Sequence, residues 1–143
     1  NRVDFRGSGP PRREYPRHAV SVTGSVFNDK RYTIMDAPGH KNYVPNMIMG
    51  AAAADFGGLV ISARKGEFEA GFEKDGQTRE HVQLAKSLGV QKLVIIVNKM
   101  DEGTVKWAKG RWDEIVQGIT PFLLATGYDE KDIYFVPISG LTG

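Results

Sequence analysis

The feature that most constrains the fold is segment 92–97, an apolar and largely β-branched stretch that leads directly into Asn98-Lys99-Met100-Asp101. In a chain where such runs alternate with helical patterns, it predicts a buried strand of a parallel sheet. Open α/β sheets bind their ligands just beyond the carboxyl ends of the strands. We therefore expect a ligand site where this strand ends.

The rest of the chain alternates strand-like runs with helical patterns, which predicts an α/β fold. Strands are expected over 20–27, 32–35, 58–63, 92–97 and 133–138, helices over 42–54, 78–88 and around 112–123, and a polar loop over 64–76. The two leading strands would form an antiparallel hairpin at one edge, through a turn at 28–30. The other strands would form a mostly parallel sheet with helices on both faces.

Composition restricts the chain to one domain without cysteine chemistry. Its 143 residues, 41% hydrophobic and 25% charged, suit a single globular domain. Because it has no Cys, disulfides, thiolate metal sites and Cys nucleophiles are excluded. No apolar run approaches the length of a membrane span, and the Arg- and Pro-rich N-terminus has no signal-peptide core. We expect a cytoplasmic protein without membrane contact.

The basic excess is confined to a leading arm. Residues 1–17 hold five Arg against Asp4 and Glu14, a balance of +3, whereas the whole chain has a net charge of +2. The remainder therefore shows no basic excess that would favour DNA or RNA. Residues 1–19 are predicted to form a disordered arm, and residues 20–143 the domain. An RNA-binding role for the arm stays open.

Three polar motifs follow predicted strands and can meet at one edge of the sheet. They are Asp36-Ala37-Pro38-Gly39, Asn98-Lys99-Met100-Asp101 and Ser139-Gly140. Each motif alone is also compatible with an ordinary polar turn. Because the carboxyl ends of parallel strands lie on one edge of a sheet, we expect the three motifs to converge there.

The later two motifs carry the donors and acceptors that guanine needs. The Asp101 carboxylate can accept hydrogen bonds from N1–H and the 2-amino group, and the Asn98 amide can meet the N7/O6 edge. The Lys99 stem can lie over the ring. Ser139 and the Gly140 backbone can support guanine O6 and the Asp101 carboxylate. A site built this way discriminates against an unmatched base such as adenine by roughly 10⁴–10⁵.

The motif at 36–39 suits the phosphate end of a nucleotide. Asp36 can hold Mg²⁺ through water, since Mg²⁺ keeps much of its hydration shell. The Gly39 N–H can touch a terminal phosphate, because no side chain obstructs it. In combination with the guanine motifs, this order of residues predicts a guanine-nucleotide-binding fold, and in this respect the chain resembles the P-loop GTPases.

At these residues the chain resembles the translational GTPases. Asp-Ala-Pro-Gly-His at 36–40 is similar to their phosphate-sensing switch, and Gly-Gln-Thr-Arg-Glu-His at 76–81 is also similar to theirs. The Gly-Glu-Phe-Glu loop at 66–69 resembles the elongation factor 1-alpha branch. Within that branch the segments 44–47, 60–69, 121–123 and 138–141 most resemble the release-factor group. A ribosome-rescue or elongation factor 1-alpha-like GTPase is the alternative.

The resemblance implies an activity, cofactors and partners. It implies Mg²⁺-assisted hydrolysis of GTP to GDP and phosphate in translation termination, on the ribosome and with the stop-codon-reading release factor as partner. It implies that His40 positions the attacking water. It also extends the guanine-binding loop at Ser139-Gly140 to Leu141.

The chain departs from the family pattern at the phosphate end. No Gly-x-x-x-x-Gly-Lys-Ser/Thr loop, which cradles nucleotide phosphates, occurs in the 143 residues, and Ala19 stands where the family has Thr. The family strand that carries this loop would lie between the strands at 32–35 and 58–63. We therefore expect a partial G domain that hydrolyses GTP poorly by itself. A degenerate, non-hydrolysing module that binds guanine nucleotides or proteins is the alternative.

Overall fold

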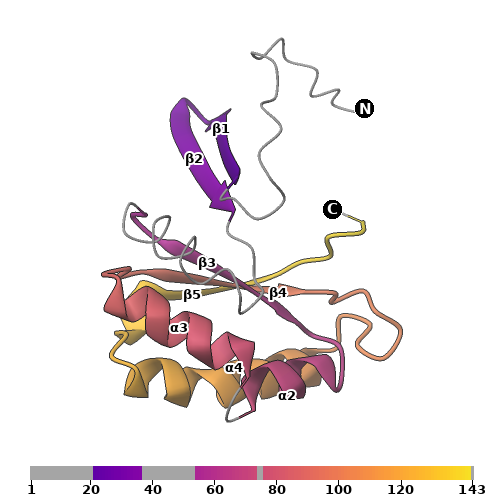
Figure 1. The fold of residues 1–143 in the computed structure, drawn as a ribbon. Coiled ribbons are helices and arrows are strands. Elements are labelled where there is room, and N and C mark those ends of the chain that lie inside the picture. The colour runs from indigo at the N-terminus through magenta and orange to yellow at the C-terminus, as the bar shows by residue number, and fades with distance from the viewer. Residues whose placement is uncertain (1–20, 37–53, 74–75, 143) are drawn as a thin grey trace.

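A computed structural model describes residues 21–36, 54–73 and 76–142 (Figure 1). The predicted helix over 42–54 and the predicted arm over 1–19 lie largely outside these residues and stay predictions. The described elements are β1 (Ser21–Phe27), β2 (Lys30–Asp36), β3 (Gly57–Ser62), α2 (Glu67–Phe72), α3 (Gln77–Ser87), β4 (Leu93–Asn98), α4 (Lys109–Ala125), the 3₁₀ turn η2 (Glu130–Asp132) and β5 (Ile133–Pro137).

A parallel sheet with β4 at its centre confirms the predicted α/β class. The strand order is β3-β4-β5, and both neighbours run parallel to β4. Ser62 of β3 is in register with Asn98 of β4, and Val97 is in register with Pro137 of β5. The three strands therefore end together, and the residues after each one emerge at the same edge.

The described helices cover one face of this sheet. In Figure 1, α2, α3 and α4 lie on the same side of β3, β4 and β5. Alternate residues of β4 point into the core, so its burial repeats with the period of two expected for a strand. The core is apolar throughout and combines Leu93, Ile95 and Val97 of β4 with Ile115, Ile119 and Leu123 of α4.

The other face of the sheet is more exposed in the described part of the chain. Val60 keeps 61% of its surface exposed and Tyr134 keeps 51%. The helix expected over 42–54 lies almost wholly outside the described residues. The prediction of helices on both faces therefore stays untested, whereas the parallel sheet itself is confirmed.

The leading hairpin is correct as an element but wrong as a sheet edge. β1 and β2 pair antiparallel from Ser21↔Asp36 to Phe27↔Lys30 and form a sheet of their own. Asn28 and Asp29 take the left-handed conformation at φ 47° and 61°, as a two-residue hairpin turn requires. No strand in the described ranges lies between β2 and β3, so no hydrogen-bonded ladder joins the hairpin to the parallel sheet.

Helix α2 occupies a stretch that the sequence pattern had predicted as loop. The Gly66 N–H donates to Glu69 Oε2 at 2.6 Å, which caps the first turn. Phe68 and Phe72 lie one turn apart and stack with ring centroids 5.7 Å apart. The three glycines of segment 64–76 concealed this short apolar stripe.

The long helix α4 continues through Pro121 to Ala125. It is followed by Gly127 at φ 101°, in agreement with the predicted helix end. None of the helices in the described ranges is long and apolar enough to cross a bilayer.

Candidate functional site

Asn98 joins the two loops that follow β4 and β5. Its Oδ1 accepts hydrogen bonds from the Lys99 N–H at 2.7 Å and from the Gly140 N–H at 2.8 Å. The backbones also pair, because the Met100 N–H donates to the Ile138 carbonyl at 3.2 Å. Two of the predicted motifs therefore meet as expected. Both bonds use Oδ1, so the Nδ2 group of Asn98 remains available as a donor.

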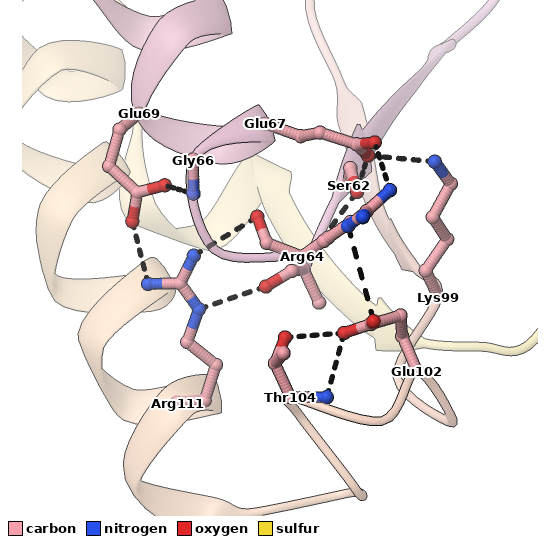
Figure 2. Close-up of polar contacts among 10 residues, drawn as sticks. Ser62, Arg64, Gly66, Glu67, Glu69, Lys99, Glu102, Thr104 and Arg111 are labelled. Atoms are coloured by element: carbon pink, nitrogen blue, oxygen red, sulfur yellow. Dashed lines mark hydrogen bonds and ion pairs between the residues drawn. The ribbon is translucent and has the colours of Figure 1, made fainter.

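Lys99 has a constrained backbone and a held side chain. Its φ of 63° lies in the left-handed region, a backbone conformation that residues other than Gly keep when the surrounding structure holds them in it. Its Nζ lies 2.7 Å from Glu67 Oε2, as Figure 2 shows. The ammonium is thus anchored at the far end of the stem.

Glu67, the first residue of α2, collects three donors at this edge. Besides Lys99 Nζ, it accepts from Ser62 Oγ at 2.7 Å and pairs with Arg64 at 3.3 Å (Figure 2). The hydrogen bond from Lys99, followed by that from Ser62, lowers the pKa of Glu67 from 4.5 to about 2. The carboxylate therefore stays ionised at every physiological pH.

Glu102 orders the loop that follows residues 98–101. Its carboxylate accepts hydrogen bonds from the backbone N–H and the hydroxyl of Thr104, and these bonds lower its pKa. It also lies 4.0 Å from Arg64. Arg64 thus lies between the carboxylates of Glu67 and Glu102 and links the loop after β3 with the loop after β4 (Figure 2).

The buried side chain of Arg111, on α4, holds the loop that follows β3. Its side chain is only 4% exposed, and its Nε donates to the Ala63 carbonyl at 2.9 Å. Its Nη1 contacts Glu69 Oε1 at 2.8 Å and Glu114 Oε2 at 2.9 Å. The hydrogen bond from Arg111 lowers the pKa of Glu69. One buried guanidinium therefore connects α4, α2 and the end of β3.

The remaining residues predicted for guanine lie around this junction. Asp101 is partly buried, and among the described residues its carboxylate has no hydrogen-bond or ion-pair partner. Ser139 is buried, and its Oγ accepts from the Thr142 N–H at 3.1 Å. Gly140 approaches Asn98 so closely that a Cβ would lie 3.3 Å from both amide atoms. Leu141 is 88% exposed.

The phosphate end is described only in part. Asp36 is the exposed last residue of β2, in the separate two-stranded sheet. Gly39 and His40 lie outside the described residues. Within those residues, no hydrogen bond or ion pair joins Asp36 to the junction at Asn98, and no group of three or more His, Asp or Glu could hold a metal ion.

The predicted site omitted Ser62, Arg64, Glu67 and Arg111. For Ser62, Arg64 and Glu67 the signal was the edge rule itself, because the loop after β3 emerges at the same edge as the loops after β4 and β5. Arg111 lies on α4, where that rule gives no signal. The predictions applied that rule to three strand ends and left out the fourth.

The described edge offers one free acceptor and one free donor. The Asp101 carboxylate can accept, and Asn98 Nδ2 can donate, beside a lysine stem anchored at its tip.

The 128 residues from 16 to 143 match the family model described as the elongation factor Tu GTP binding domain. The chain belongs to this family.

The similar proteins point to one branch of that family. The chain is 61% identical over 115 residues to the eukaryotic peptide chain release factor GTP-binding subunit of Kluyveromyces lactis, covering 80% of this chain and 16% of the relative. It is 56% identical over 126 residues to the same-named subunit of Ogataea pini, covering 87% and 17%. The chain thus spans about a sixth of the length of these curated relatives.

Solved structures agree with the fold. Sup35 complexed with GDP superposes with a TM-score of 0.70 at 44% identity, over 85% of this chain and 28% of that one. Elongation factor SelB from Methanococcus maripaludis, in complex with a GTP analogue, gives 0.68 at 21% identity over 88% and 25%, which supports the fold alone. The predicted resemblance to translational GTPases, and to their release-factor group, is confirmed.

Proposed function

We propose that the chain supplies the guanine-recognising part of a GTPase that acts in translation termination, as the GTP-binding subunit of a eukaryotic peptide chain release factor. The observation that carries the proposal is the junction of Asn98, Asp101 and Gly140 at one edge of the sheet. There the Asn98 Oδ1 is fixed by two backbone donors, and the Asp101 carboxylate, three residues further along the chain, has no partner among the described residues.

Each group has a role in reading the base. Asp101 accepts from N1–H and the 2-amino group of guanine, and Asn98 Nδ2 donates to the N7/O6 edge. Lys99 lays its stem over the ring. The loop at Ser139, Gly140 and Leu141 closes over O6. Adenine presents no N1 proton and a donor at position 6, so it leaves these groups unpaired.

Hydrolysis belongs to the whole protein in this proposal. Asp36 would hold Mg²⁺ through water, the Gly39 N–H would contact the terminal phosphate, and His40 would position the attacking water. Support comes from their order along the chain and from family membership. When bound at Asp36, Mg²⁺ would supply positive charge that neutralises the phosphate oxygens.

The partners follow from the names of the relatives. The chain's similarity to release factor GTP-binding subunits supports a ribosome-bound protein that works with a stop-codon-reading release factor in the cytoplasm. The same names favour termination over the ribosome-rescue or elongation alternatives.

A titration with fluorescent GDP and ADP analogues tests the base site. We expect saturable binding of the GDP analogue that unlabelled GDP displaces and unlabelled ADP does not. Asp101→Asn should move the preference from GDP towards XDP, because xanthine has an acceptor where guanine has the 2-amino donor and the new amide can donate to it. Equal displacement by GDP and ADP would refute the proposal.

A further inference from the structure

We propose that Glu67 is a positioning residue of the guanine site: its carboxylate holds the Lys99 ammonium and so fixes the Lys99 stem at the base-binding edge. The inference rests on the proposed function and adds a residue to that site. It begins from one contact, 2.7 Å from Lys99 Nζ to Glu67 Oε2, between residues 32 positions apart.

A lysine that is to pack along a base needs its stem held in one direction. The stem has four carbons and many rotamers. Without a partner, the ammonium would stay in water and the stem would exchange between these rotamers. The left-handed backbone of Lys99 sets the start of the stem, because its N–H is held by Asn98 Oδ1 at 2.7 Å. Glu67 sets the other end. With both ends fixed, the apolar middle of the side chain is presented in a single conformation.

Glu67 is suited to this task because it is itself fixed. Ser62 Oγ donates to the same Oε2 at 2.7 Å, and Arg64 Nη1 contacts Oε1 at 3.3 Å. Ser62 is paired in register with Asn98, the residue before Lys99. The anchor and the lysine therefore belong to the neighbouring ends of β3 and β4, whose separation is set by the sheet.

The loop that carries Glu67 is held by the buried Arg111. Its guanidinium donates to the carbonyls of Ala63, at 2.9 Å, and Arg64, at 3.4 Å, and pairs with Glu69, two residues after Glu67 (Figure 2). Movement of this loop would expose a charge that is now 4% accessible. The position of Glu67 is thus fixed from the core.

The pair is poorly explained as a stabilising ion pair. The Lys99 side chain is 47% exposed and that of Glu67 38% exposed, and ion pairs at such exposure contribute little to folding. Its effect should therefore appear in nucleotide binding. Because Glu67 acts only through Lys99, its loss should matter only while Lys99 is present.

A double-mutant cycle on the full chain tests this dependence, with affinity for a fluorescent GDP analogue as the readout. We expect Glu67→Gln to weaken binding about tenfold. Glu67→Asp should also weaken it, because its carboxylate is one methylene too short to reach. Lys99→Met should weaken binding at least as much as Glu67→Gln, and the double variant no more than Lys99→Met alone. Glu130→Gln, an exposed carboxylate on η2, is the matched control and should bind like the parent.

A second readout needs no nucleotide. Acetylation of Lys99, followed by mass spectrometry, should be faster in Glu67→Gln than in the parent and unchanged in Glu130→Gln. Equal GDP affinity of the parent and Glu67→Gln, or losses that multiply in the double variant, would overturn this inference alone. Failure of the parent to bind the GDP analogue would instead overturn the proposed function, and this inference with it.

Discussion

The Gly140 N–H donates to Asn98 Oδ1 at 2.8 Å, and this bond joins the loop after β5 to the loop after β4. The same oxygen accepts from the Lys99 N–H, so one amide sets the position of both loops. Asn98 thereby connects the two loops in the structure, in addition to its proposed role in reading the base. Its Nδ2 is directed by bonds that its Oδ1 makes within the protein.

Gly140→Ala should weaken guanine-nucleotide binding about tenfold. The added Cβ would lie 3.3 Å from both amide atoms of Asn98 and must displace them. Titration with a fluorescent GDP analogue measures the loss. Gly110→Ala is the control, because a Cβ there meets nothing within 4 Å. It should bind GDP like the parent and, in helix α4, raise stability by about 0.5–1 kcal/mol. Unchanged affinity in Gly140→Ala would contradict this account of the Asn98 amide.

Arg111→Met should lower the free energy of unfolding by about 3 kcal/mol, because it leaves the Ala63 carbonyl without its donor and removes a buried pair partner. Arg111→Lys should not restore the loss, since one ammonium cannot reproduce the guanidinium fork. Urea denaturation measures both. Lys109→Met, which removes an exposed pair with Asp113, should change stability by no more than about 0.5 kcal/mol. If Arg111→Lys were as stable as the parent, the several hydrogen bonds of the guanidinium would not be needed for stability.

The Glu67 carboxyl should titrate with a pKa of about 2 in the folded chain. Lys99→Met should raise that pKa towards 4.5, because the hydrogen bond from Lys99 is the largest cause of its lowering. Because the pair is exposed, the depressed pKa contributes only a little stability, which is present above pH 4.5 and is lost as the pH falls towards 2. Carbon-13 NMR of the Glu67 carboxyl measures the midpoint. An identical midpoint in both proteins would show that the pair does not form in solution.

Tyr128→Phe should leave stability unchanged or raise it by up to about 1–2 kcal/mol, because the Tyr128 hydroxyl is buried without a hydrogen-bond partner in the described structure. Burial raises the pKa of Tyr128 from 10.0 to about 12. Ionisation of Tyr128 is therefore easier in the unfolded chain than in the folded one. It leaves the stability of the fold unchanged below pH 10 and lowers it as the pH rises from 10 towards 12.

Unfolding titrations across that pH range separate the parent from the variant. Tyr128→Phe should remove this part of the alkaline loss, and Tyr134→Phe, an exposed tyrosine, should not. A large destabilisation of Tyr128→Phe at neutral pH would reveal a partner for the hydroxyl.

Much of the fold was predictable from local sequence. The runs at 58–63, 92–97 and 133–138 are strands β3, β4 and β5 within one or two residues, and the Asn28-Asp29 turn forms as expected. These signals are local, since an apolar run or a turn residue acts on its own backbone. The edge rule also predicts that the motifs holding Asn98 and Gly140 converge.

Helix α2 was not predictable in the same way, whereas a gap between the hairpin and the parallel sheet agrees with the missing family strand between 32–35 and 58–63. The glycines around α2 concealed a stripe of two phenylalanines, and the pairing of β2 depends on a neighbouring strand distant in sequence. Local propensity decides neither the formation of α2 nor the pairing of β2, because both depend on tertiary contacts.

The sequence by itself determined the family, the parallel strands and the guanine motifs at their ends, because each depends on residues adjacent along the chain. Only the tertiary structure decided that Glu67 holds Lys99 and that Arg111 fixes the loop that carries Glu67. Those contacts span 32 to 48 residues, and no periodicity records them. They exist because the sheet brings the ends of β3 and β4 together and α4 packs beneath them.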